Sequence, residues 1–343
     1  MTYDLSRVEA RCPICGRSEA EVLWSVDAAQ VTGMALLSER DPGRAQALQA
    51  HIESLWGARD CRIVRCRNCT FEFADPFVAG DARFYELIYE DFAYARRKWD
   101  WRVTAERLRA LVPGPKAPDA MLLEVGAGSG AFLRELVPEI LRPDQVVCTE
   151  FNPEALSRLR ELGVRAEAGD FRALDASLDG RISFLCMFHV LEHLDGPEAA
   201  FERLTRLATP DARMFISLPN PLNAAFHEER DVWLEWPPHH VGRWPRRAFE
   251  VIGERFGWEL VEHRVEPVSA ARFLALFALS RMLQRSRKHG SLSRRARLLE
   301  DRRLRMLACA PLLALEAARA VPVLSHLGGA DLGRSHWVEM RRS

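Results

Sequence analysis

From Met121 onward, short apolar runs alternate with helical stretches. The strand-like runs are MLLEV, VVCTEF, VRAEAGD, ISFLCMF, MFISLP and WELVEHRV. Helical stretches lie between them, for example Gly130 to Val137 and Pro153 to Leu162. Continuous apolar strands separated by helices predict a parallel sheet that is covered on both faces, which is an α/β fold.

The chain on either side of this pattern differs in composition. The N-terminal part holds two pairs of cysteines and a helical stretch near Ala45 to Trp56. The part that follows is aromatic and charged, which indicates helices, and it ends in a stiff linker with Pro113, Pro115 and Pro118. After the alternating pattern comes a long helical insertion and then a last strand-like run, SHWVEMRR. We therefore expect a module at 1–75, a helical connector at 76–118 and a sheet domain at 119–343 that contains the insertion at 269–327.

A glycine-rich turn follows the first strand of the sheet domain. In LLEVGAGSGAFL, Gly126, Gly128 and Gly130 allow a tight turn and a close approach to a ligand. The helix that follows directs its unpaired N–H groups at that ligand. With Ala131 in the last position, the turn also satisfies the G-x-G-x-x-G/A pattern of NAD-binding folds, so the turn alone leaves two cofactor classes open.

Acidic residues near three strand ends separate the two cofactor classes. Glu124 precedes the first glycine, where a negative charge suits an ammonium and a sulfonium better than a pyrophosphate. Glu150 ends the next strand and can accept hydrogen bonds from both ribose hydroxyls. Asp170 and Phe171 follow the third strand, where an acidic residue beside an aromatic can hold an adenine edge. Together these positions favour S-adenosylmethionine.

The order EVGAGSG, Glu150, GDF, FHVLEHL and ISLPNP resembles the class I S-adenosylmethionine-dependent methyltransferases. The resemblance covers about Met121 to Val265. It implies a Rossmann-like seven-stranded sheet with one antiparallel strand, and a cofactor that lies across the first two strand ends. One departure is Thr209-Pro210-Asp211-Ala212, where the family usually has a Pro-Gly-Gly turn. The cofactor-binding residues that we expect are Glu124, Gly126, Ala127, Gly128, Gly130, Glu150, Asp170 and Phe171.

Two C-x-x-C pairs stand in the N-terminal module, Cys12 with Cys15 and Cys66 with Cys69. Each pair places two thiolates on one tight turn, and two such turns complete a tetrahedral Zn²⁺ site. A site with four protein ligands has no open position, so we expect a structural zinc. The gap of 50 residues between the pairs is longer than usual, and the helical stretch explains it.

A zinc module before this kind of domain resembles the sugar C-methyltransferases of deoxysugar pathways. The resemblance implies that Tyr85, Tyr89 and Tyr94 lie in a segment that leans over the active site.

Two groups of histidines follow strands of the sheet domain and could supply a catalytic base. His189 and His193 follow the fourth strand, in His189-Val190-Leu191-Glu192-His193. The resemblance implies that His193 is functional; the alternative is that it pins the next helix. In ubiquinone-pathway O-methyltransferases the same motif binds a divalent metal, so Glu192 and His193 remain an alternative metal site.

The second group lies in Trp233-Leu234-Glu235-Trp236-Pro237-Pro238-His239-His240, with Arg243-Trp244 after it. Three indoles near two histidines favour a sugar-stacking wall, and the alternative is a loop that is packed by tryptophan. His240 aligns with the histidine of a Glu-His pair in sugar C-methyltransferases, whose glutamate position is His239 here. The catalytic candidates are therefore His193 and His240, followed by His189 and His239.

The insertion is strongly basic. Arg281 to Arg305 holds ten basic residues against Glu300 and Asp301. Three interpretations stay open: a helical cap with solvated arginines, a site for a phosphorylated or nucleotide-linked substrate, or adsorption to an anionic membrane surface through 270–327. Pro311 and Pro322 predict breaks in its helices. A nucleic-acid partner is not expected, because the run lacks interleaved aromatic residues.

The bulk properties of the 343 residues limit the classes of function. A formal net charge of zero gives the whole chain no general affinity for nucleic acid. The N-terminus lacks the apolar core of a signal peptide, and no run of 18 residues is free of charge, so we expect a cytoplasmic location. The expected function is methyl transfer from S-adenosylmethionine to oxygen or carbon of a small molecule, such as a glycosyl or lipid-linked precursor. The alternatives are a metal-assisted phenolic O-methyltransferase and a non-catalytic, zinc-bearing partner protein.

Overall fold

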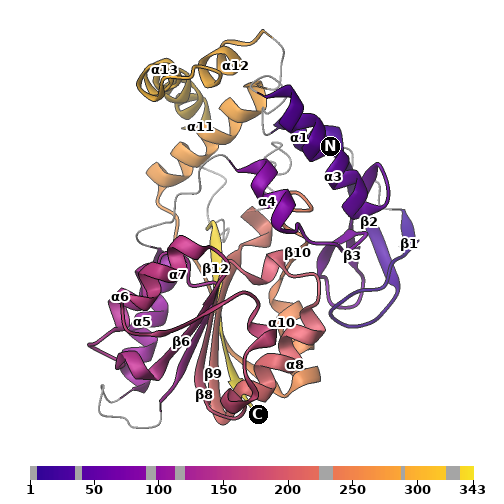
Figure 1. Cartoon of the computed structure of the whole chain (residues 1–343). Helices are drawn as coiled ribbons and strands as arrows, with labels where there is room; N and C mark the ends of the chain where they lie inside the picture. Colours follow the sequence, from indigo (N-terminus) through magenta and orange to yellow (C-terminus); the bar gives the residue numbers. More distant parts are fainter. Residues whose placement is uncertain are drawn as a thin grey trace.

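Seven strands form the large sheet in a computed structural model, which describes residues 6–34, 41–89, 98–112, 120–223, 235–286, 290–321 and 333–343. Their order across the sheet is β11-β12-β9-β8-β5-β6-β7 (Figure 1). Among these seven described strands, β12 is the one that runs opposite to the other six. The expected seven-stranded sheet with one antiparallel strand is confirmed. The strands are β5 (Leu122–Val125), β6 (Val146–Glu150), β7 (Arg165–Ala168), β8 (Ile182–Phe188), β9 (Ala208–Pro219), β11 (Trp258–Val265) and β12 (Ser335–Arg342).

Helices cover both faces of this sheet, as the apolar strands require (Figure 1). On one face, Phe132 of α6 and Leu159 of α7 join a core with β5 and β6. On the other face, Phe201 of α8 and Phe249 of α10 join a second core. The helices and short 3₁₀ turns of this domain are α5 (Trp99–Leu111), α6 (Ala131–Leu136), η1 (Pro143–Gln145), α7 (Pro153–Arg160), η2 (Phe171–Ala173), η3 (Ala176–Leu178), η4 (Leu191–His193), α8 (Pro197–Leu207) and α10 (Arg246–Phe256).

The departure at Thr209-Pro210-Asp211-Ala212 takes the form of a bulged strand. In the pairing of β8 with β9, Ile182 lies opposite Ala208, but Phe184 lies opposite Arg213. The extra residues of β9 are accommodated by this shift in register. The chain therefore enters the fifth parallel strand without a glycine turn.

A second sheet lies in the N-terminal module, in the order β1-β2-β3-β4-β10. A helix, α3, starts at its cap residue Asp41, whose carboxylate accepts the Arg44 N–H, and ends at Gly57, which has φ +61°. This helix confirms the helical stretch between the cysteine pairs. The last strand of the sheet, β10, comes from residues 242–243, far along the chain from the other four strands. The sequence pattern did not predict this pairing. The elements are β1 (Arg7–Glu9), β2 (Glu19–Asp27), α1 (Ala28–Met34), α3 (Pro42–Trp56), β3 (Asp60–Cys66), β4 (Glu72–Asp75), α4 (Ala82–Ile88) and β10 (Gly242–Arg243).

In the described part of the chain between β11 and β12, three helices form the expected insertion, and Figure 1 shows them projecting away from the large sheet. They are α11 (Ala270–Ser286), α12 (Leu292–Arg297) and α13 (Arg302–Ala320). The predicted break at Pro311 is wrong, because α13 continues through it. A proline costs the helix one N–H bond, and the bonds before and after it maintain this exposed helix.

Several residues singled out in the sequence lie outside the described ranges: Pro113, Pro115, Pro118, Tyr94, Trp233 and Pro322. Within the described ranges, the helices are all too short or too polar to cross a lipid bilayer.

Candidate active site

The glycine loop after β5 has the backbone conformation that its sequence predicts. Gly126, Gly128 and Gly130 have φ values of +70°, +54° and +72°, a region that favours glycine. A Cβ on Gly126 would lie 2.8 Å from Cγ2 of Val190, so the loop after β8 packs directly on this turn. The N–H groups of Gly126 and Ala127 both donate to the Thr149 carbonyl, at 3.0 Å. The loop is thereby fixed to the end of β6.

Glu150 at the end of β6 is positioned by backbone donors. Its Oε2 accepts the Gly128 N–H at 2.7 Å, and its Oε1 accepts the N–H groups of Phe151 and Asn152 at 2.9 and 3.0 Å. A carboxylate has about four lone-pair directions, so acceptor capacity remains for a ribose hydroxyl. Phe151, which sequence reasoning missed, is 74% exposed beside this carboxylate and offers an open ring face. The signal for it was an aromatic residue directly after the acidic strand end.

Glu124 is buried in β5, before the first glycine. Burial raises the pKa of its carboxyl well above the ordinary range, and the charge of Glu150 adds to this rise, while Lys98 opposes it. Its Oε2 atom has no hydrogen-bond partner among the described residues. An ammonium group brought to this position would offset the cost of the buried negative charge. This geometry fits the methionine end of S-adenosylmethionine.

Asp170 and Phe171 lie after β7, but only the Asp170 side chain is partly exposed. The Asp170 carboxylate accepts the Arg172 N–H at 2.8 Å and the Arg172 Nε at 2.9 Å. Burial opposes ionisation of Asp170, yet the Arg172 guanidinium holds its pKa below the usual range. The Phe171 ring is 2% exposed and belongs to the core. Any contact of Phe171 with an adenine would therefore come from its backbone.

His193 ends the η4 turn after β8, and its ring orientation is determined by its neighbours. Its Nδ1 lies 2.7 Å from the His239 carbonyl oxygen and 3.0 Å from the Tyr85 hydroxyl. A carbonyl only accepts, so Nδ1 carries the proton and Nε2 carries the lone pair. Burial and the neighbouring His240 lower the pKa of His193 to about 4, so this imidazole is neutral at pH 7.

His239 and His240 come from the turn before β10 and lie against His193. The ring centroid of His193 is 4.9 Å from that of His239 and 4.7 Å from that of His240. His239 Nε2 lies 2.6 Å from the Tyr89 hydroxyl, and His240 Nδ1 lies 3.1 Å from Glu235 Oε2. The structure thus joins three of the four candidate histidines and two of the three tyrosines in one cluster.

His189 lies apart from that cluster, between two buried carboxylates. Its Nε2 is 3.5 Å from Asp100 Oδ2, and its Nδ1 is 3.3 Å from Glu192 Oε1. Burial lowers the pKa of His189, but the nearby carboxylates of Asp100 and Glu192 outweigh burial, and the pKa is raised. Its φ of +57° is rare for a residue with a side chain. His189 is therefore held between two carboxylates rather than open as a base, and Asp100 of α5 is a partner that the sequence did not reveal.

The sugar-stacking wall of indoles is wrong for the two tryptophans that the structure describes. Trp236 and Trp244 are each 1% exposed and belong to hydrophobic cores. The aromatic residues beside the histidines are instead Tyr85 and Tyr89, whose rings stack with centroids 6.2 Å apart. The segment that bears His239 and His240 is therefore packed by tryptophan, and the aromatic rings next to the histidines are those of the tyrosines.

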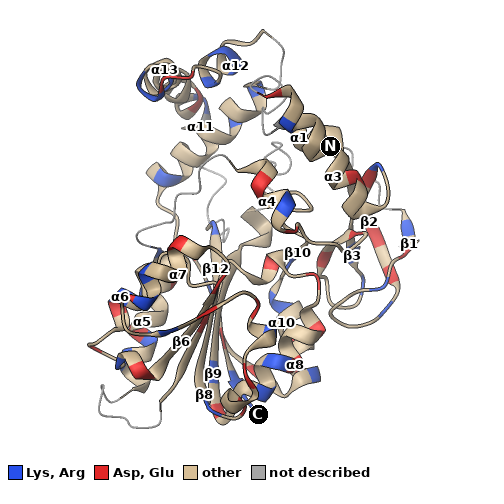
Figure 2. Cartoon of the chain, in the orientation of Figure 1, with Lys and Arg blue, Asp and Glu red and all other residues tan. Residues whose placement is uncertain are grey.

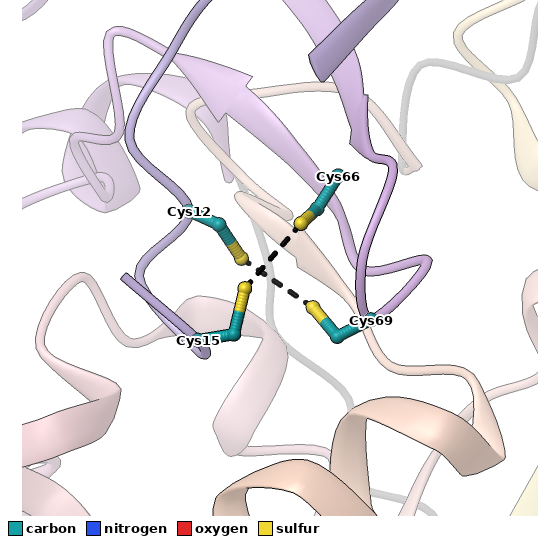
Figure 3. Close-up of side chains that lie close together, drawn as sticks. All are labelled: Cys12, Cys15, Cys66 and Cys69. Carbon is teal, nitrogen blue, oxygen red and sulfur yellow. Dashed lines mark hydrogen bonds between the residues drawn. The ribbon is translucent and has the colours of Figure 1, made fainter. Parts of the chain in front are cut away.

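The four cysteines of the N-terminal pairs converge, with their sulfurs pointing toward a common centre (Figure 3). Cys12 Sγ lies 3.5 Å from Cys69 Sγ, and Cys15 Sγ lies 3.4 Å from Cys66 Sγ. Zn–S bonds of about 2.3 Å in a tetrahedron put sulfurs about 3.8 Å apart, whereas a disulfide requires about 2.05 Å. The Ile14 and Asn68 N–H groups donate to Cys12 and Cys66, at 3.4 Å each. The cluster therefore fits a zinc ion.

The chain matches a protein family described as "Methyltransferase domain" over residues 93–263, about half its length. The match contains the glycine loop, Glu150, Asp170 and all four candidate histidines. The chain belongs to the S-adenosylmethionine-dependent methyltransferases, and it is an enzyme of that class.

Solved structures similar to this chain include an S-adenosylmethionine-dependent methyltransferase from Archaeoglobus fulgidus. It is 17% identical, with a TM-score of 0.44, and the alignment covers 76% of this chain and 100% of that one. Another, from Mesorhizobium loti, is 14% identical, with a TM-score of 0.42 and coverage of 71% and 100%. No curated protein matches this chain. The family assignment therefore depends on the domain match.

Proposed function

We propose that this enzyme transfers a methyl group to an oxygen or carbon atom of a small molecule, of the glycosyl or lipid-linked precursor class. The observation that carries the proposal is the cluster of His193, His239 and His240 with Tyr85 and Tyr89, which come from three separate segments. The cluster adjoins the cofactor loop, because Val190, three residues before His193, packs on Gly126.

The residues of the cluster have distinct roles in this proposal. S-adenosylmethionine supplies an electrophilic methyl group when it is bound by the glycine loop, Glu124, Glu150 and Asp170. An oxygen or carbon acceptor must lose a proton as it is methylated, and we assign that proton to Nε2 of His240. Its Nδ1–H donates to Glu235, whose carboxylate would stabilise the imidazolium that forms.

The tyrosines would orient the acceptor rather than deprotonate it. Burial raises the pKa of Tyr85, with Tyr89 and Glu192 adding to the rise, and burial raises the pKa of Tyr89 to about 12. Both phenols therefore stay protonated at pH 7 and can donate hydrogen bonds to acceptor oxygens. His193, with its low pKa, stays neutral beside them.

The experiment is to measure S-adenosylhomocysteine release with a panel of nucleotide-linked sugars, polyprenyl-linked sugars and phenols. His240→Ala should lower the rate by about 10²–10⁴-fold with the best acceptor, while calorimetry shows unchanged cofactor affinity. A His240→Ala enzyme with the wild-type rate would contradict the assigned base. Turnover of phenols alone would contradict the acceptor class.

A second candidate is metal-assisted methylation of a phenolic oxygen, and one observation favours it. Nitrogen atoms of His193, His239 and His240 all lie within 4.8 Å of one another, a spacing that can hold a divalent cation. Glu192, expected as a ligand with His193, is directed to His189 instead. With the cysteine site already loaded with zinc, a second bound Co²⁺ that His239→Ala removes would support this candidate. Binding of no second metal would exclude it.

A further inference from the structure

Most of the large apolar side chains that are exposed in the described part of the chain lie in the helical insertion. Eleven large apolar side chains are exposed, and eight of them lie between residues 279 and 321. Single exposed leucines are ordinary, but a concentration of this kind marks an interaction surface. These eight are Leu279, Leu292, Leu299, Leu304, Met306, Leu307, Leu315 and Val321.

Helix α13 orders part of this surface into a stripe. Leu304, Leu307, Pro311 and Leu315 are all exposed, and they are spaced by three, four and four residues. Residues at this spacing lie on one face of a helix, because each turn takes about 3.6 residues. Leu304 and Leu307 are 57% and 71% exposed. We call these four residues the α13 stripe.

The opposite side of α13 carries a buried charge. Glu316 is 3% exposed and faces α11, where its carboxylate lies 3.0 Å from Arg285 and 3.9 Å from Arg281; Arg319 of its own helix adds a contact at 2.9 Å. At 100° per residue, Glu316 lies about 135° round the helix from the α13 stripe. A helix that caps a domain in water normally buries its leucines and exposes its glutamates, whereas in α13 Glu316 is buried and the leucines of the α13 stripe are exposed.

Arginines accompany the α13 stripe on the same two helices: Arg295, Arg302 and Arg303 are exposed, whereas Arg294 and Arg297 donate inward to Ser286 of α11. In α12 and the first turn of α13 there are six, against the exposed Glu300 and Asp301, and Figure 2 shows basic residues on both helices. Asp301 is engaged as the cap of α13, where its carboxylate accepts the Arg303 and Leu304 N–H groups. The six are Arg294, Arg295, Arg297, Arg302, Arg303 and Arg305.

We propose that α12 and α13 dock this enzyme onto an anionic lipid surface, with the α13 stripe in the apolar layer and the arginines among the headgroups. Exposed leucines together with exposed arginines on the same two helices match the two layers of such a surface, because long arginine side chains can reach the headgroups while their stems stay apolar. A second copy of the chain is disfavoured, because a symmetric contact would bring the two basic clusters together. The helix lies on the bilayer and does not span it.

The experiment measures binding of the full, zinc-loaded chain to vesicles by co-sedimentation. Vesicles of phosphatidylcholine with about 30% phosphatidylglycerol should bind it at least tenfold more tightly than phosphatidylcholine alone, and raised salt should weaken binding. Leu304→Glu/Leu307→Glu should lower the affinity at least tenfold. Arg302→Ala/Arg303→Ala should lose most of the preference for anionic lipid but keep the weak binding to phosphatidylcholine.

Val261→Glu is the matched control, because Val261 is 42% exposed on β11, away from the insertion. It should bind vesicles like the wild type. Unchanged circular dichroism and cofactor affinity in each variant would show that folding is intact, which the exposure of the substituted side chains favours. Equal binding to both kinds of vesicle, or unchanged binding by Leu304→Glu/Leu307→Glu, would overturn the proposal. So would a wild-type dimer that the same double variant converts to a monomer, since the stripe would then be a contact between copies.

Discussion

The cysteine cluster and the histidine–tyrosine cluster are built in opposite ways. The four thiols come from two tight turns of one small sheet, converge on one centre and leave no ligand position open. The histidines and tyrosines come from α4 and its cap residue Tyr89, from η4 and from the turn before β10, and they contact one another in a largely buried cluster. A closed cluster stabilises a fold, whereas an open one can exchange protons with a ligand.

The two clusters are nevertheless connected by one segment of backbone. The Ala74 N–H of β4 donates to the Val241 carbonyl, and the Val241 N–H donates to the Glu192 carbonyl, both at 2.9 Å. The segment that bears His239 and His240 is thus held between the cysteine module and the large sheet. The cysteine cluster therefore helps to position the histidine–tyrosine cluster, because it stabilises the sheet whose strand β4 holds Val241.

The largest effect is expected from Cys66→Ser, which removes one of the four thiolates of the cysteine cluster. Zinc binding to structural sites contributes on the order of 10 kcal/mol to folding, so loss of one ligand should release the metal and unfold the N-terminal module. Metal analysis should show the zinc lost, and thermal unfolding should begin well below the wild-type temperature. Methyl transfer should fail while the cofactor still binds, because the glycine loop belongs to the other sheet.

Cys309→Ser provides the control, since Cys309 is partly exposed in α13 and stands outside the cluster. It should keep the zinc content and the unfolding temperature of the wild type. A Cys66→Ser chain with full zinc content and normal stability would break the distinction between a closed structural cluster and an open catalytic one.

A smaller effect, confined to the open cluster, is expected from Glu235→Gln. Glutamine keeps a hydrogen-bonding group near Nδ1 of His240 but removes the charge that would stabilise its protonated form. The rate should fall about 10²-fold while zinc content and unfolding temperature stay unchanged. Glu53→Gln, at a partly exposed site on α3, is the matched substitution and should have no effect on the rate. An equal loss of rate in Glu235→Gln and Glu53→Gln would mean that Glu235 has no specific role in catalysis.

The sheet and the cofactor loop follow from local patterns, and the acceptor cluster does not. Strands such as Ile182–Phe188 are apolar at nearly every position, and the glycines must follow one of them, so both are legible in the sequence. The meeting of Tyr85 with His193 joins residues 108 positions apart. That contact depends on how β10 pairs with β4, and a two-residue strand carries no periodic signal of its own.

Burial separates the residues that sequence reasoning placed well from those it placed poorly. Tryptophan beside histidine suits both a binding wall and a core, and the chain uses Trp236 and Trp244 for the core. His189 follows the same strand as His193, so the sequence alone groups it with the candidate bases. Its carboxylate partner Asp100 lies on α5, in a part of the chain with no motif to point to it.

The Asp100 contact gives a third prediction, of intermediate size. Asp100→Asn keeps a polar partner for the Ser217 hydroxyl, which donates to Asp100, but removes one of the two carboxylates that raise the pKa of His189. We expect a loss of about 1–3 kcal/mol in the free energy of unfolding and a lower pKa for His189, measured by denaturant titration and by NMR titration of the imidazole. An unchanged His189 pKa would show that Glu192 alone raises it.

The smallest effect concerns His336 of β12, an imidazole without a carboxylate partner in the described contacts. Its Nδ1 lies 3.0 Å from His263 Nε2, and burial, with His263 adding to it, lowers the pKa of His336 to about 3. In the unfolded chain a histidine titrates near pH 6.5, so between about pH 6.5 and 3 the unfolded state binds a proton that the folded state does not. Stability should therefore fall by about 1.4 kcal/mol per pH unit as the pH falls through this range.

His336→Gln should remove that one-proton slope, which urea unfolding of both chains at pH 7 and pH 5 would measure as a smaller loss of stability for the variant. The sign is opposite for His189, whose raised pKa gives a contribution that is present in acid and is lost as the pH rises through the folded-state value. Equal slopes in the wild type and His336→Gln would mean that His336 is already protonated in the folded state. If a histidine without a carboxylate partner is protonated as well, the carboxylates of Asp100 and Glu192 are not what determines the charge of His189.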